Sequence, residues 1–460
     1  MKNSINYFKD KKIVIMGLGL LGGALNDAIY LLKCGAKLII TDTKTEKELA
    51  SSVKNLKSLK NTPGSYILHL GGHRLEDFSA QGGQAKADFI LQPGNVPVDS
   101  LYLLEAQKNN IPIHESESLF MANAHNIKIV GTTGTRGKTT TTHLIYEILK
   151  EAFGKRVHLA GNVKGISTLA LLDKIKSGDI VVLELDSWCL HGIGEIKKSP
   201  QISVFTNLMP DHLNFYMKGS ENEAEAMQKY FMDKAQIFAN QNENDFLILD
   251  KDIKKIIGER YKDIPIKSKI ILIKNTSEIK SWKLKIKGEY NYRHVLRARE
   301  VARILGVQDK VIKRVAENFG GVEGRQDFVR EYKGIKIYND TTATTPDATI
   351  AALEALGTKK TKKVVLIMGG ADKGLDMSGL LKEIPRYCKK VILLSGTGSE
   401  KLEALHFIKS ADLKEAVNKA LSFCKKGDVF IFSPAYASFG MFKNEFDRGD
   451  KFVRIIKNLK

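Results

Sequence analysis

The stretch GTTGTRGKTTTT, residues 131–142, decides the fold of the middle of this chain. It follows an apolar run, IKIV at 127–130, and precedes a helix-like pattern, HLIYEILKEAF at 143–153. A strand, a glycine-rich turn, a lysine and a helix start form a cradle for phosphate, because backbone N–H groups and the helix N-terminus attract anions. In such a cradle Lys138 reaches the terminal phosphates and the Thr139 hydroxyl holds Mg²⁺. We therefore predict an ATP site.

The spacing of the glycines departs from the usual G-x-x-x-x-G-K-[ST] pattern, because Thr132 stands where the first glycine should be. The turn reads G-x-x-G-x-x-G-K-T instead, with Gly131, Gly134 and Gly137. The alternative interpretation is a glycine turn followed by a chance Lys-Thr pair. The strand pattern before it and the helix pattern after it favour the phosphate site.

The composition of the chain is that of an ordinary globular protein. Its 460 residues are enough for about three domains, with 43% hydrophobic and 27% charged residues. No apolar run reaches about 18 residues, so we expect no membrane insertion. The N-terminus runs straight into a strand and a glycine turn, unlike a signal peptide, which predicts a cytoplasmic protein. The four cysteines lie far apart, without a C-x-x-C pair, so neither a disulfide framework nor a zinc site is indicated.

The net charge of +20 raises the question of a nucleic-acid partner. Lysine is spread along the chain in short runs, such as those at 251–257 and 358–363, without interleaved aromatic residues. This pattern favours a lysine-rich solvated surface, part of which would suit anionic substrates. We expect no nucleic-acid partner.

Residues 11–42 read as strand, glycine turn, helix and strand. Gly17, Gly19 and Gly22 have the G-x-G-x-x-G spacing, and Asp42 ends the second strand. Such a unit is typical of a dinucleotide fold with the acid on a ribose hydroxyl, but it fits any ligand that carries a nucleoside diphosphate. Further strand–helix pairs close a first domain at residues 1–122.

Apolar strands alternate with helical segments through the rest of the chain, which predicts mostly parallel sheets covered by helices and an α/β fold. We place a central domain at residues 123–299 and a C-terminal domain at 300–460. The expected strands lie at 179–187, 201–208, 245–250, 269–274, 334–340, 363–370, 390–396 and 428–435.

Polar side chains follow several of these strands at the edge where α/β sheets bind their ligands. Glu184, beside the phosphate loop, is well placed to hold Mg²⁺, although a salt-bridged surface glutamate is the alternative. Asp211 and His212 follow another strand, where a histidine is either structural or a metal ligand. Lys234 lies in a helix-like segment, and its pattern alone favours a surface lysine with an apolar stem.

The third domain repeats the arrangement with a cation, an acid and hydroxyls near strand ends. Arg325, Asp340, Thr344 and Lys373 would suit a phosphoryl group in transfer and an anionic acceptor. Each of them alone could be a loop residue with a local hydrogen bond.

Together these pieces, in this order, resemble the Mur ligase family of peptidoglycan synthesis. The matching segments cover nearly the whole chain: GLGLLGG, TGTRGKTT, GNVKG, ELDSW, NLMPDHL, KAQIF, GEYN, EGR, YNDTTATTPDAT, GGADKG and SPAYASFGMFKNEFDRG. Family members are three-domain, ATP-dependent amide ligases that add amino acids to a UDP-N-acetylmuramoyl carboxylate. The branch this chain most resembles adds D-glutamate to UDP-N-acetylmuramoyl-L-alanine. The resemblance implies Rossmann-like outer domains around a central ATPase domain, with the first turn holding the UDP substrate.

The resemblance also implies roles for individual residues. The ATP-binding set is Gly134, Thr135, Gly137, Lys138, Thr139, Thr140, Asn291, Arg325 and Asp340. Two Mg²⁺ ions would be held by Thr139, Glu184, His212 and Lys234, the last matching a lysine that is carbamylated with CO₂ in this branch. The UDP-substrate set is Gly17, Gly19, Leu20, Leu21, Asp42, Thr43 and Asn162. The acceptor set is Thr344, Lys373, Ser438 and Phe439. The catalytic residues would be Lys138, Lys234, His212 and Arg325.

Three positions depart from the pattern of the D-glutamate branch. Thr342 stands where a lysine is common, Glu445 replaces an aromatic residue near the acceptor, and His294 replaces an asparagine near the adenine. Losing a cation and gaining an anion leaves the reaction class intact but weakens the assignment of D-glutamate as the acceptor.

Other interpretations remain open at this stage. A Mur-type ligase for another amino acid, or a folylpolyglutamate-like ligase, is the nearest alternative, and the N-terminal glycine turn argues against the latter. A nicotinamide-dependent oxidoreductase would use residues 11–42 but would leave GTRGKTT and NLMPDHL without a purpose. A basic, nucleic-acid-stimulated ATPase is the third alternative. We expect a monomer that acts on small molecules.

Overall fold

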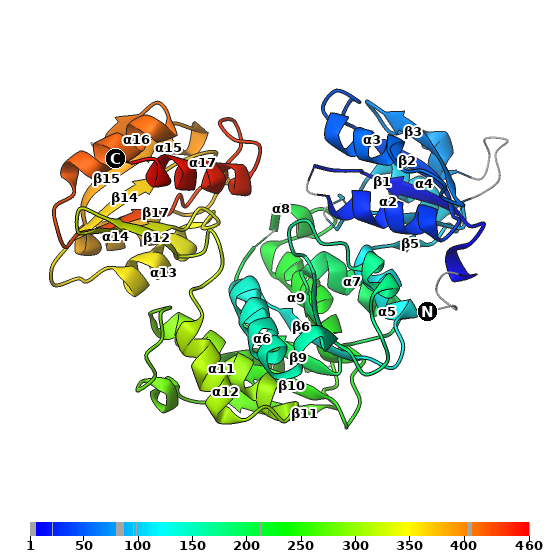
Figure 1. Ribbon diagram of the computed structural model, residues 1–460, viewed down its shortest axis with the longest axis horizontal. Coiled ribbons are helices and arrows are strands. Elements are labelled where there is room, and N and C mark those ends of the chain that lie inside the picture. The colour runs from blue at the N-terminus through cyan, green and yellow to red at the C-terminus, as the bar shows by residue number, and fades with distance from the viewer. Residues whose placement is uncertain are drawn as a thin grey trace. The chain divides into compact units, whose positions relative to one another are not determined.

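The computed structural model describes residues 6–20, 22–79, 87–94, 96–97, 99–211, 213–262, 264–402 and 407–459. The chain divides into two compact units (Figure 1). The first consists of Met1–Lys274 and Arg297–Val311, and the second of Asn275–Leu296 and Ile312–Lys460. Helices α11 (Glu289–Ile304) and α12 (Asp309–Asn318) contribute residues to both units.

The first unit begins with a five-stranded parallel sheet in the order β3-β2-β1-β4-β5. Its strands are β1 (Lys12–Met16), β2 (Lys37–Asp42), β3 (Ser65–Leu70), β4 (Phe89–Leu91) and β5 (Ile113–His114). Its helices are α2 (Gly23–Lys33), α3 (Ala50–Lys57), α4 (Leu101–Lys108), α5 (Ser116–Asn123) and the short 3₁₀ helix η1 (Leu75–Phe78). The central strand β1 is buried from Ile13 to Met16, as its unbroken apolar run predicts for a parallel sheet covered on both faces.

A second sheet of the same unit has six parallel strands in the order β11-β10-β9-β6-β8-β7. The strands are β6 (Lys128–Thr133), β7 (Val157–Gly161), β8 (Ile180–Glu184), β9 (Ile202–Phe205), β10 (Phe246–Asp250) and β11 (Lys269–Ile273). The helices are α6 (Lys138–Phe153), α7 (Ser187–Glu195), α8 (Leu213–Tyr216), α9 (Glu223–Ala239), α10 (Lys251–Arg260), η2 (Gly154–Arg156) and η3 (Leu169–Asp173). Because β6 lies between β8 and β9, the loop at its carboxyl end adjoins the carboxyl ends of both neighbours.

The position of Gly131 differs from the prediction. Strand β6 runs on through Gly131 to Thr133, so the turn begins at Gly134 and not at Gly131. Gly131 serves packing instead, because a Cβ there would lie 2.5 Å from Cγ of Pro200 and 3.1 Å from Cδ1 of Leu185.

The second unit contains a six-stranded sheet in the order β12-β13-β17-β14-β15-β16, in which only β12 runs antiparallel to its neighbour. The strands are β12 (Asp327–Tyr332), β13 (Ile335–Asn339), β14 (Val364–Met368), β15 (Cys388–Leu394), β16 (Ile408–Ser410) and β17 (Val429–Phe432). The helices are η4 (Thr276–Ile279), α13 (Pro346–Leu356), α14 (Ser378–Tyr387), α15 (Thr397–Glu400), α16 (Leu413–Phe423) and α17 (Glu445–Lys457).

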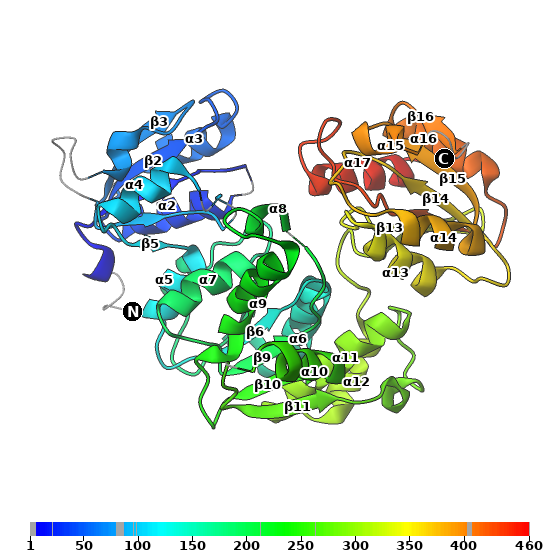
Figure 2. The ribbon, with the colours of Figure 1, turned by 180° about the vertical axis from the view of Figure 1, so that it is seen from behind.

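Alternate residues of this sheet enter two separate cores. Val365 and Ile367 of β14 pack with apolar residues of α16 and α17, whereas Val364, Leu366 and Met368 pack with those of α13 and α14. The sheet therefore lies between two helical layers, as the two opposite views show (Figures 1 and 2). Within the described parts of both units, no helix combines the length and apolar character needed to cross a bilayer.

Candidate nucleotide-binding site

The loop between β6 and α6 has the backbone shape that its glycines predict. Gly137, directly before α6, has a left-handed conformation with φ of 78°. Gly134 has φ of 138°, and a Cβ there would lie only 2.0 Å from Oγ1 of Thr206. No other residue could hold this backbone so close to the end of β9, because any side chain would clash and the φ value is strained for L-residues.

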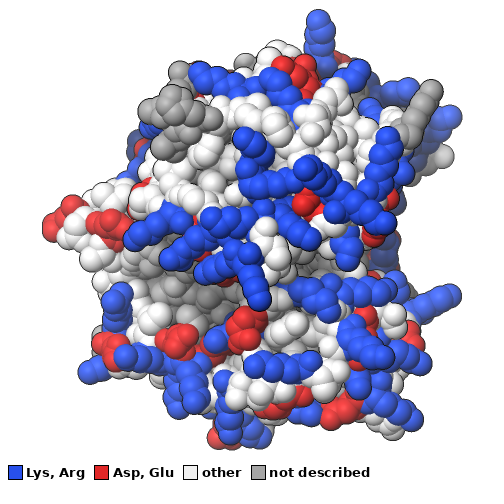
Figure 3. Space-filling model, turned by 90° about the vertical axis from the view of Figure 1, so that its left-hand side faces the viewer, with Lys and Arg blue, Asp and Glu red and all other residues white. Residues whose placement is uncertain are grey.

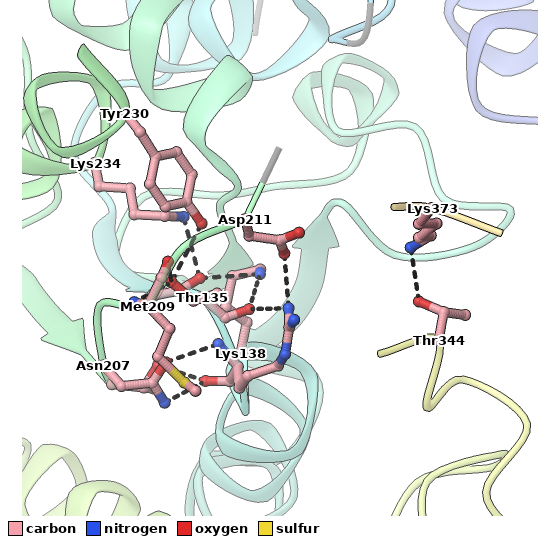
Figure 4. A network of polar contacts seen from close by, with 12 residues as sticks. Thr135, Lys138, Asn207, Met209, Asp211, Tyr230, Lys234, Thr344 and Lys373 are labelled. Carbon is pink, nitrogen blue, oxygen red and sulfur yellow. Dashed lines mark hydrogen bonds and ion pairs between the residues drawn. The ribbon is translucent and has the colours of Figure 1, made fainter. Parts of the chain in front are cut away.

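The segment after β9 fixes the loop through hydrogen bonds at consecutive residues (Figure 4). The Thr135 amide donates to the backbone oxygen of Asn207 (2.9 Å), and the Arg136 amide donates to Asn207 Oδ1 (2.8 Å). The Arg136 carbonyl in turn accepts from Asn207 Nδ2 (3.0 Å) and from the Thr206 hydroxyl (2.6 Å). The Asn207 side chain therefore holds both the amide and the carbonyl group of Arg136. Asn207 belongs to the NLMPDHL motif, in which no role was predicted for it.

Two cations of the loop point at oxygen atoms beside it. Lys138 Nζ donates to the carbonyl oxygens of Gly134 (3.0 Å) and Thr135 (3.2 Å). The Arg136 guanidinium forms an ion pair with Asp211, with Nη1 2.7 Å from Oδ2. A ligand with several negative charges would meet both cations here.

Thr139 and Glu184 come together as the sequence predicts. The Thr139 hydroxyl, in the first turn of α6, donates to Glu184 Oε1 at 3.0 Å. Glu184 is buried at the end of β8. The amide of Asn162, a predicted substrate contact, donates to the Glu184 carbonyl at 2.8 Å, and the Asn162 side chain is exposed. A hydroxyl and a carboxylate at this distance are oxygen ligands of the kind that Mg²⁺ prefers.

Lys234 is buried, contrary to the surface position that its pattern alone favoured. It lies on α9 with 1% exposure, and Nζ donates to the Gly134 carbonyl at 3.1 Å. Its ammonium lies 4.7 Å from the centroid of the Tyr230 ring, whose hydroxyl contacts Thr135 Oγ1 at 3.2 Å. Burial first, and then the nearby Lys138 charge, hold the pKa of Lys234 well below its ordinary value.

The remaining predicted metal ligand, His212, lies outside the described residues. The structure describes Asp211 before it and α8 after it. Among the described residues, no group of three or more His, Cys, Asp and Glu side chains forms a ready metal site. The donors that the structure brings together at the loop are therefore Thr139 and Glu184, while Lys234 donates to the Gly134 carbonyl.

The first glycine turn is closed by Asp42. Its Oδ2 accepts from the amides of Leu18 (2.9 Å) and Gly19 (3.0 Å), and its Oδ1 accepts from the Lys44 amide (2.8 Å). Gly17, Gly19 and Gly22 all have positive φ values, of 89°, 64° and 89°. Leu20 of the turn is 53% exposed, Thr43 after β2 is also exposed, and Leu21 lies outside the described residues. Asp42 thus shapes the turn in this structure.

In the second unit, the predicted ATP residues form one connected group. Asp340 follows β13, and its Oδ1 accepts from the Gln326 amide (3.0 Å) while its Oδ2 accepts from Ser433 Oγ (2.7 Å). Gln326 also accepts from Asn291 Nδ2 at 3.1 Å. Burial raises the pKa of Asp340 to about 7, against the opposing effects of these hydrogen bonds and of the Arg325 charge.

The predicted acceptor residues lie at the carboxyl edge of the same sheet. Lys373, after β14, donates from Nζ to Thr344 Oγ1 at 3.0 Å (Figure 4). Ser438 is buried in the loop after β17, and Phe439 is 68% exposed. The loops after β14 and β17 meet at an antiparallel bridge between Ala371 and Ala437.

The three unusual positions have local structural roles. Thr342 donates from its hydroxyl to the Gly324 carbonyl at 2.8 Å. Glu445 begins α17, and its carbonyl accepts from Thr341 Oγ1 at 3.1 Å. His294 is buried edge-on to Tyr290, with ring centroids 4.6 Å apart.

Comparisons with known proteins match this chain over almost its whole length. A model of the Mur ligase middle domain matches residues 132–302, and a model of the Mur ligase glutamate ligase domain matches residues 324–436. A UDP-N-acetylmuramoylalanine–D-glutamate ligase of Borreliella afzelii is 33% identical over 483 residues, covering 99% of both chains. A protein of the same name from a Roseiflexus species is 33% identical over 485 residues, covering 97% of this chain and 98% of that one.

Solved structures share the fold. A UDP-N-acetylmuramate-alanine ligase from Thermotoga maritima has a TM-score of 0.60 at 18% identity, covering 98% of this chain and 100% of the other. A MurF ligase from Thermotoga maritima, in complex with ADP, has a TM-score of 0.60 at 17% identity and covers 99% and 98%. At these identities the likeness establishes the fold alone.

Proposed function

We propose that this chain, which belongs to the Mur ligase family, joins D-glutamate to the carboxylate of UDP-N-acetylmuramoyl-L-alanine at the expense of ATP. Such an acid–D-amino-acid ligase builds the peptide part of the peptidoglycan precursor. The observation that carries the proposal is the similarity over the full length to D-glutamate ligases, together with a phosphate loop of the required shape. ATP and a nucleotide sugar are substrates of the cytoplasm, so we place the reaction there.

The proposal divides the chain into three domains, one for each sheet. Residues 1–122 form a Rossmann-like domain for the UDP substrate, residues 123–299 a central ATPase domain, and residues 300–460 a Rossmann-like acceptor domain. The sheets of five, six and six strands support this division.

The reaction needs ATP because a carboxylate does not react with an amine at neutral pH. The substrate carboxylate takes the γ-phosphoryl group of ATP and becomes an acyl phosphate. The bond between the γ-phosphorus and ADP breaks in this step, and ADP leaves. The amine of the incoming amino acid then attacks the acyl carbon, and phosphate leaves as the amide forms. In this scheme, Lys138 and Arg325 balance the charge of the γ-phosphoryl group, and most of the rate enhancement comes from positioning and electrostatics.

Magnesium fits the donors beside the loop. Thr139 Oγ1 and Glu184 Oε1, 3.0 Å apart, would hold one ion, and His212 with a carbamylated Lys234 would hold a second. The ions would neutralise phosphate charge. The support for the carbamate is chemical, since burial and the nearby Lys138 charge hold the pKa of Lys234 well below its ordinary value and so favour the neutral amine, the form that adds to CO₂.

The other substrate contacts follow the family resemblance. The residues assigned to binding of the UDP substrate are Gly17, Gly19, Leu20, Leu21, Asp42, Thr43 and Asn162. The ATP contacts are Gly134, Thr135, Gly137, Thr140, Asn291 and Asp340, in addition to Lys138, Thr139 and Arg325. The residues assigned to binding of the incoming amino acid are Thr344, Lys373, Ser438 and Phe439.

Phosphate release from ATP tests the function directly. The purified protein is incubated with UDP-N-acetylmuramoyl-L-alanine and a panel of amino acids that includes both glutamate enantiomers. We expect release with D-glutamate only. Release with another amino acid would support a Mur-type ligase whose acceptor is not D-glutamate, which is the alternative that Thr342 and Glu445 raise. No release with any of them would contradict the proposed substrate.

A further inference from the structure

The side chain of Arg136 has no role so far, although it lies inside the phosphate loop. Its backbone is fixed, because the amide is held by Asn207 Oδ1 and the carbonyl by both Asn207 Nδ2 and the Thr206 hydroxyl. The side chain is 21% exposed, and so is in contact with solvent at the rim of the loop. Only the guanidinium can therefore change its partner without a change in the shape of the loop.

The guanidinium lies beside the position that Lys138 marks for phosphate. Arg136 Nη1 is 3.5 Å from the Thr135 carbonyl oxygen, and Lys138 Nζ is 3.2 Å from the same oxygen. The first distance is at the limit of a hydrogen bond, so it defines proximity and not a strong contact. Two cations thus converge on one neutral acceptor, at a place where a polyphosphate would offer several charged oxygens.

The carboxylate of Asp211, which forms an ion pair with Arg136, competes with such a ligand. Asp211 Oδ2 lies 2.7 Å from Nη1, and this carboxylate is 17% exposed. A carboxylate next to the loop both occupies the guanidinium and repels an incoming phosphate. A phosphate group can bind a guanidinium through two parallel hydrogen bonds and carries more charge than a carboxylate, so it can displace Asp211.

We propose that Arg136 is a further catalytic residue, which leaves Asp211 when ATP binds and contacts the terminal phosphate beside Lys138. The inference rests on the proposed function, since it assigns this cation to the phosphoryl group that is transferred. Arg136 then distinguishes ATP from ADP, because it contacts the phosphate that only ATP carries.

Nucleotide binding tests the proposal without catalysis. We would measure the Kd of ADP and of the non-hydrolysable analogue AMP-PNP by calorimetry, for the full chain and for Arg136→Gln. We expect the substitution to weaken AMP-PNP by about tenfold to a hundredfold, the worth of a hydrogen bond to a charged group, and to leave ADP nearly unchanged. Arg136→Lys should recover part of the loss, because it restores the charge without the fork.

The matched control is Arg303→Gln. Arg303, on α11, forms an ion pair of similar length, with Nη2 2.8 Å from Asp309 Oδ2. Its loss should change neither Kd. Equal weakening of ADP and AMP-PNP by Arg136→Gln, or no weakening of either, would overturn the role of Arg136. Failure of the unmodified protein to bind both nucleotides would instead contradict the proposed function.

A second variant tests whether Asp211 competes with phosphate for Arg136 or instead stabilises the phosphate loop. Asp211→Asn removes the competing carboxylate, so we expect AMP-PNP to bind at least as tightly as to the unmodified protein, measured in EDTA to exclude metal contacts. If the ion pair instead only supports the loop, Asp211→Asn will weaken AMP-PNP as Arg136→Gln does, and the proposal is wrong.

Discussion

At the scale of single residues, Lys234 shows how surroundings set reactivity. Its ammonium is buried beside another cation, and both effects hold its pKa well below the ordinary value, which favours the neutral, nucleophilic amine. We predict that protein incubated with ¹³C-bicarbonate shows a carbamate signal by NMR, and that Lys234→Gln loses it. Acidification should release the carbamate, because protonation removes the free amine.

The control for this prediction is Lys198→Gln. Burial also lowers the pKa of Lys198, which donates to the Met121 carbonyl at 2.7 Å. The signal should survive this substitution. A signal that persists in Lys234→Gln would show that carbamylation occurs elsewhere in the chain.

Asp27 is a second residue whose surroundings change its chemistry. It is buried on α2, and its Oδ1 accepts from Ser116 Oγ (2.9 Å) and from the Ser167 hydroxyl. Burial, with a smaller effect of Glu117, raises the pKa of Asp27 to about 7 from 3.8. The folded protein therefore keeps a proton that the unfolded chain loses near pH 4. The stabilisation is full below that pH and is lost as pH rises through about 7.

We predict that Asp27→Asn flattens the dependence of stability on pH. The unfolding free energy, measured by urea denaturation between pH 5 and 8, should fall less with pH in the variant, by on the order of a few kcal/mol. Glu115 and Asp340, whose pKa values burial raises to about 8 and about 7, titrate in the same direction and should leave a residual slope. An unchanged slope would mean that Asp27 is ionised in the folded protein.

At the scale of elements, the phosphate loop depends on its fit against the end of β9. Gly134→Ala would place a Cβ 2.0 Å from Thr206 Oγ1, at a φ value of 138° that alanine rarely adopts. We predict a loss of at least about 2 kcal/mol in the unfolding free energy and of ADP binding, measured by denaturation and calorimetry. Gly258→Ala is the control, because Gly258 lies in α10 with open space around it and should gain slightly from the better helix former. Normal ADP binding by Gly134→Ala would show that the loop can reshape.

The sequence predicted the elements better than it predicted contacts between them. Apolar runs located strands such as β8 and β17, because a parallel strand buried on both faces is continuously apolar. Strand β3 (Ser65–Leu70) has only exposed and partly buried residues, so it lacks this signal, and the strand was not predicted. Glu184 was predicted to lie beside the phosphate loop because it ends an apolar strand at the edge where α/β sheets bind their ligands. The burial of Lys234 and the brace formed by Asn207 depend on how α9 and the segment after β9 pack, which local patterns do not encode.

At the scale of the whole molecule, the placement of charge differs from its spread along the sequence. Four neighbouring strands pair in register near their starts: Lys336, the second residue of β13, pairs with Val429, Val429 with Val364, and Val364 with Cys388. The loops that lead into these strands therefore meet at the amino edge of the sheet. This amino edge, defined as residues 331–336, 357–363, 386–390 and 424–428, holds eleven Lys and Arg against two acids in 23 residues.

The amino edge thus carries a net +9 of the total +20, on the side of the sheet opposite the predicted acceptor residues. Basic side chains also predominate on the face of the molecule shown in Figure 3. The lysine runs that look dispersed in the sequence are brought together by the parallel register. Charges within about 10 Å reinforce one another at physiological salt, so a cluster produces a stronger local field than the same charges apart.

We predict that placement, more than net charge, governs binding of this protein to a polyanionic matrix. One variant changes the four lysines of 357–363 to glutamine. A second variant with the same net charge changes four exposed lysines from separate places, Lys33, Lys60, Lys174 and Lys414. On a heparin column the first variant should elute at clearly lower salt than the second, because it removes part of a coherent field, whereas ligase activity should be unchanged in both. Equal elution of the two variants would mean that the amino edge acts only through its contribution to net charge, and the clustering would then have no electrostatic consequence.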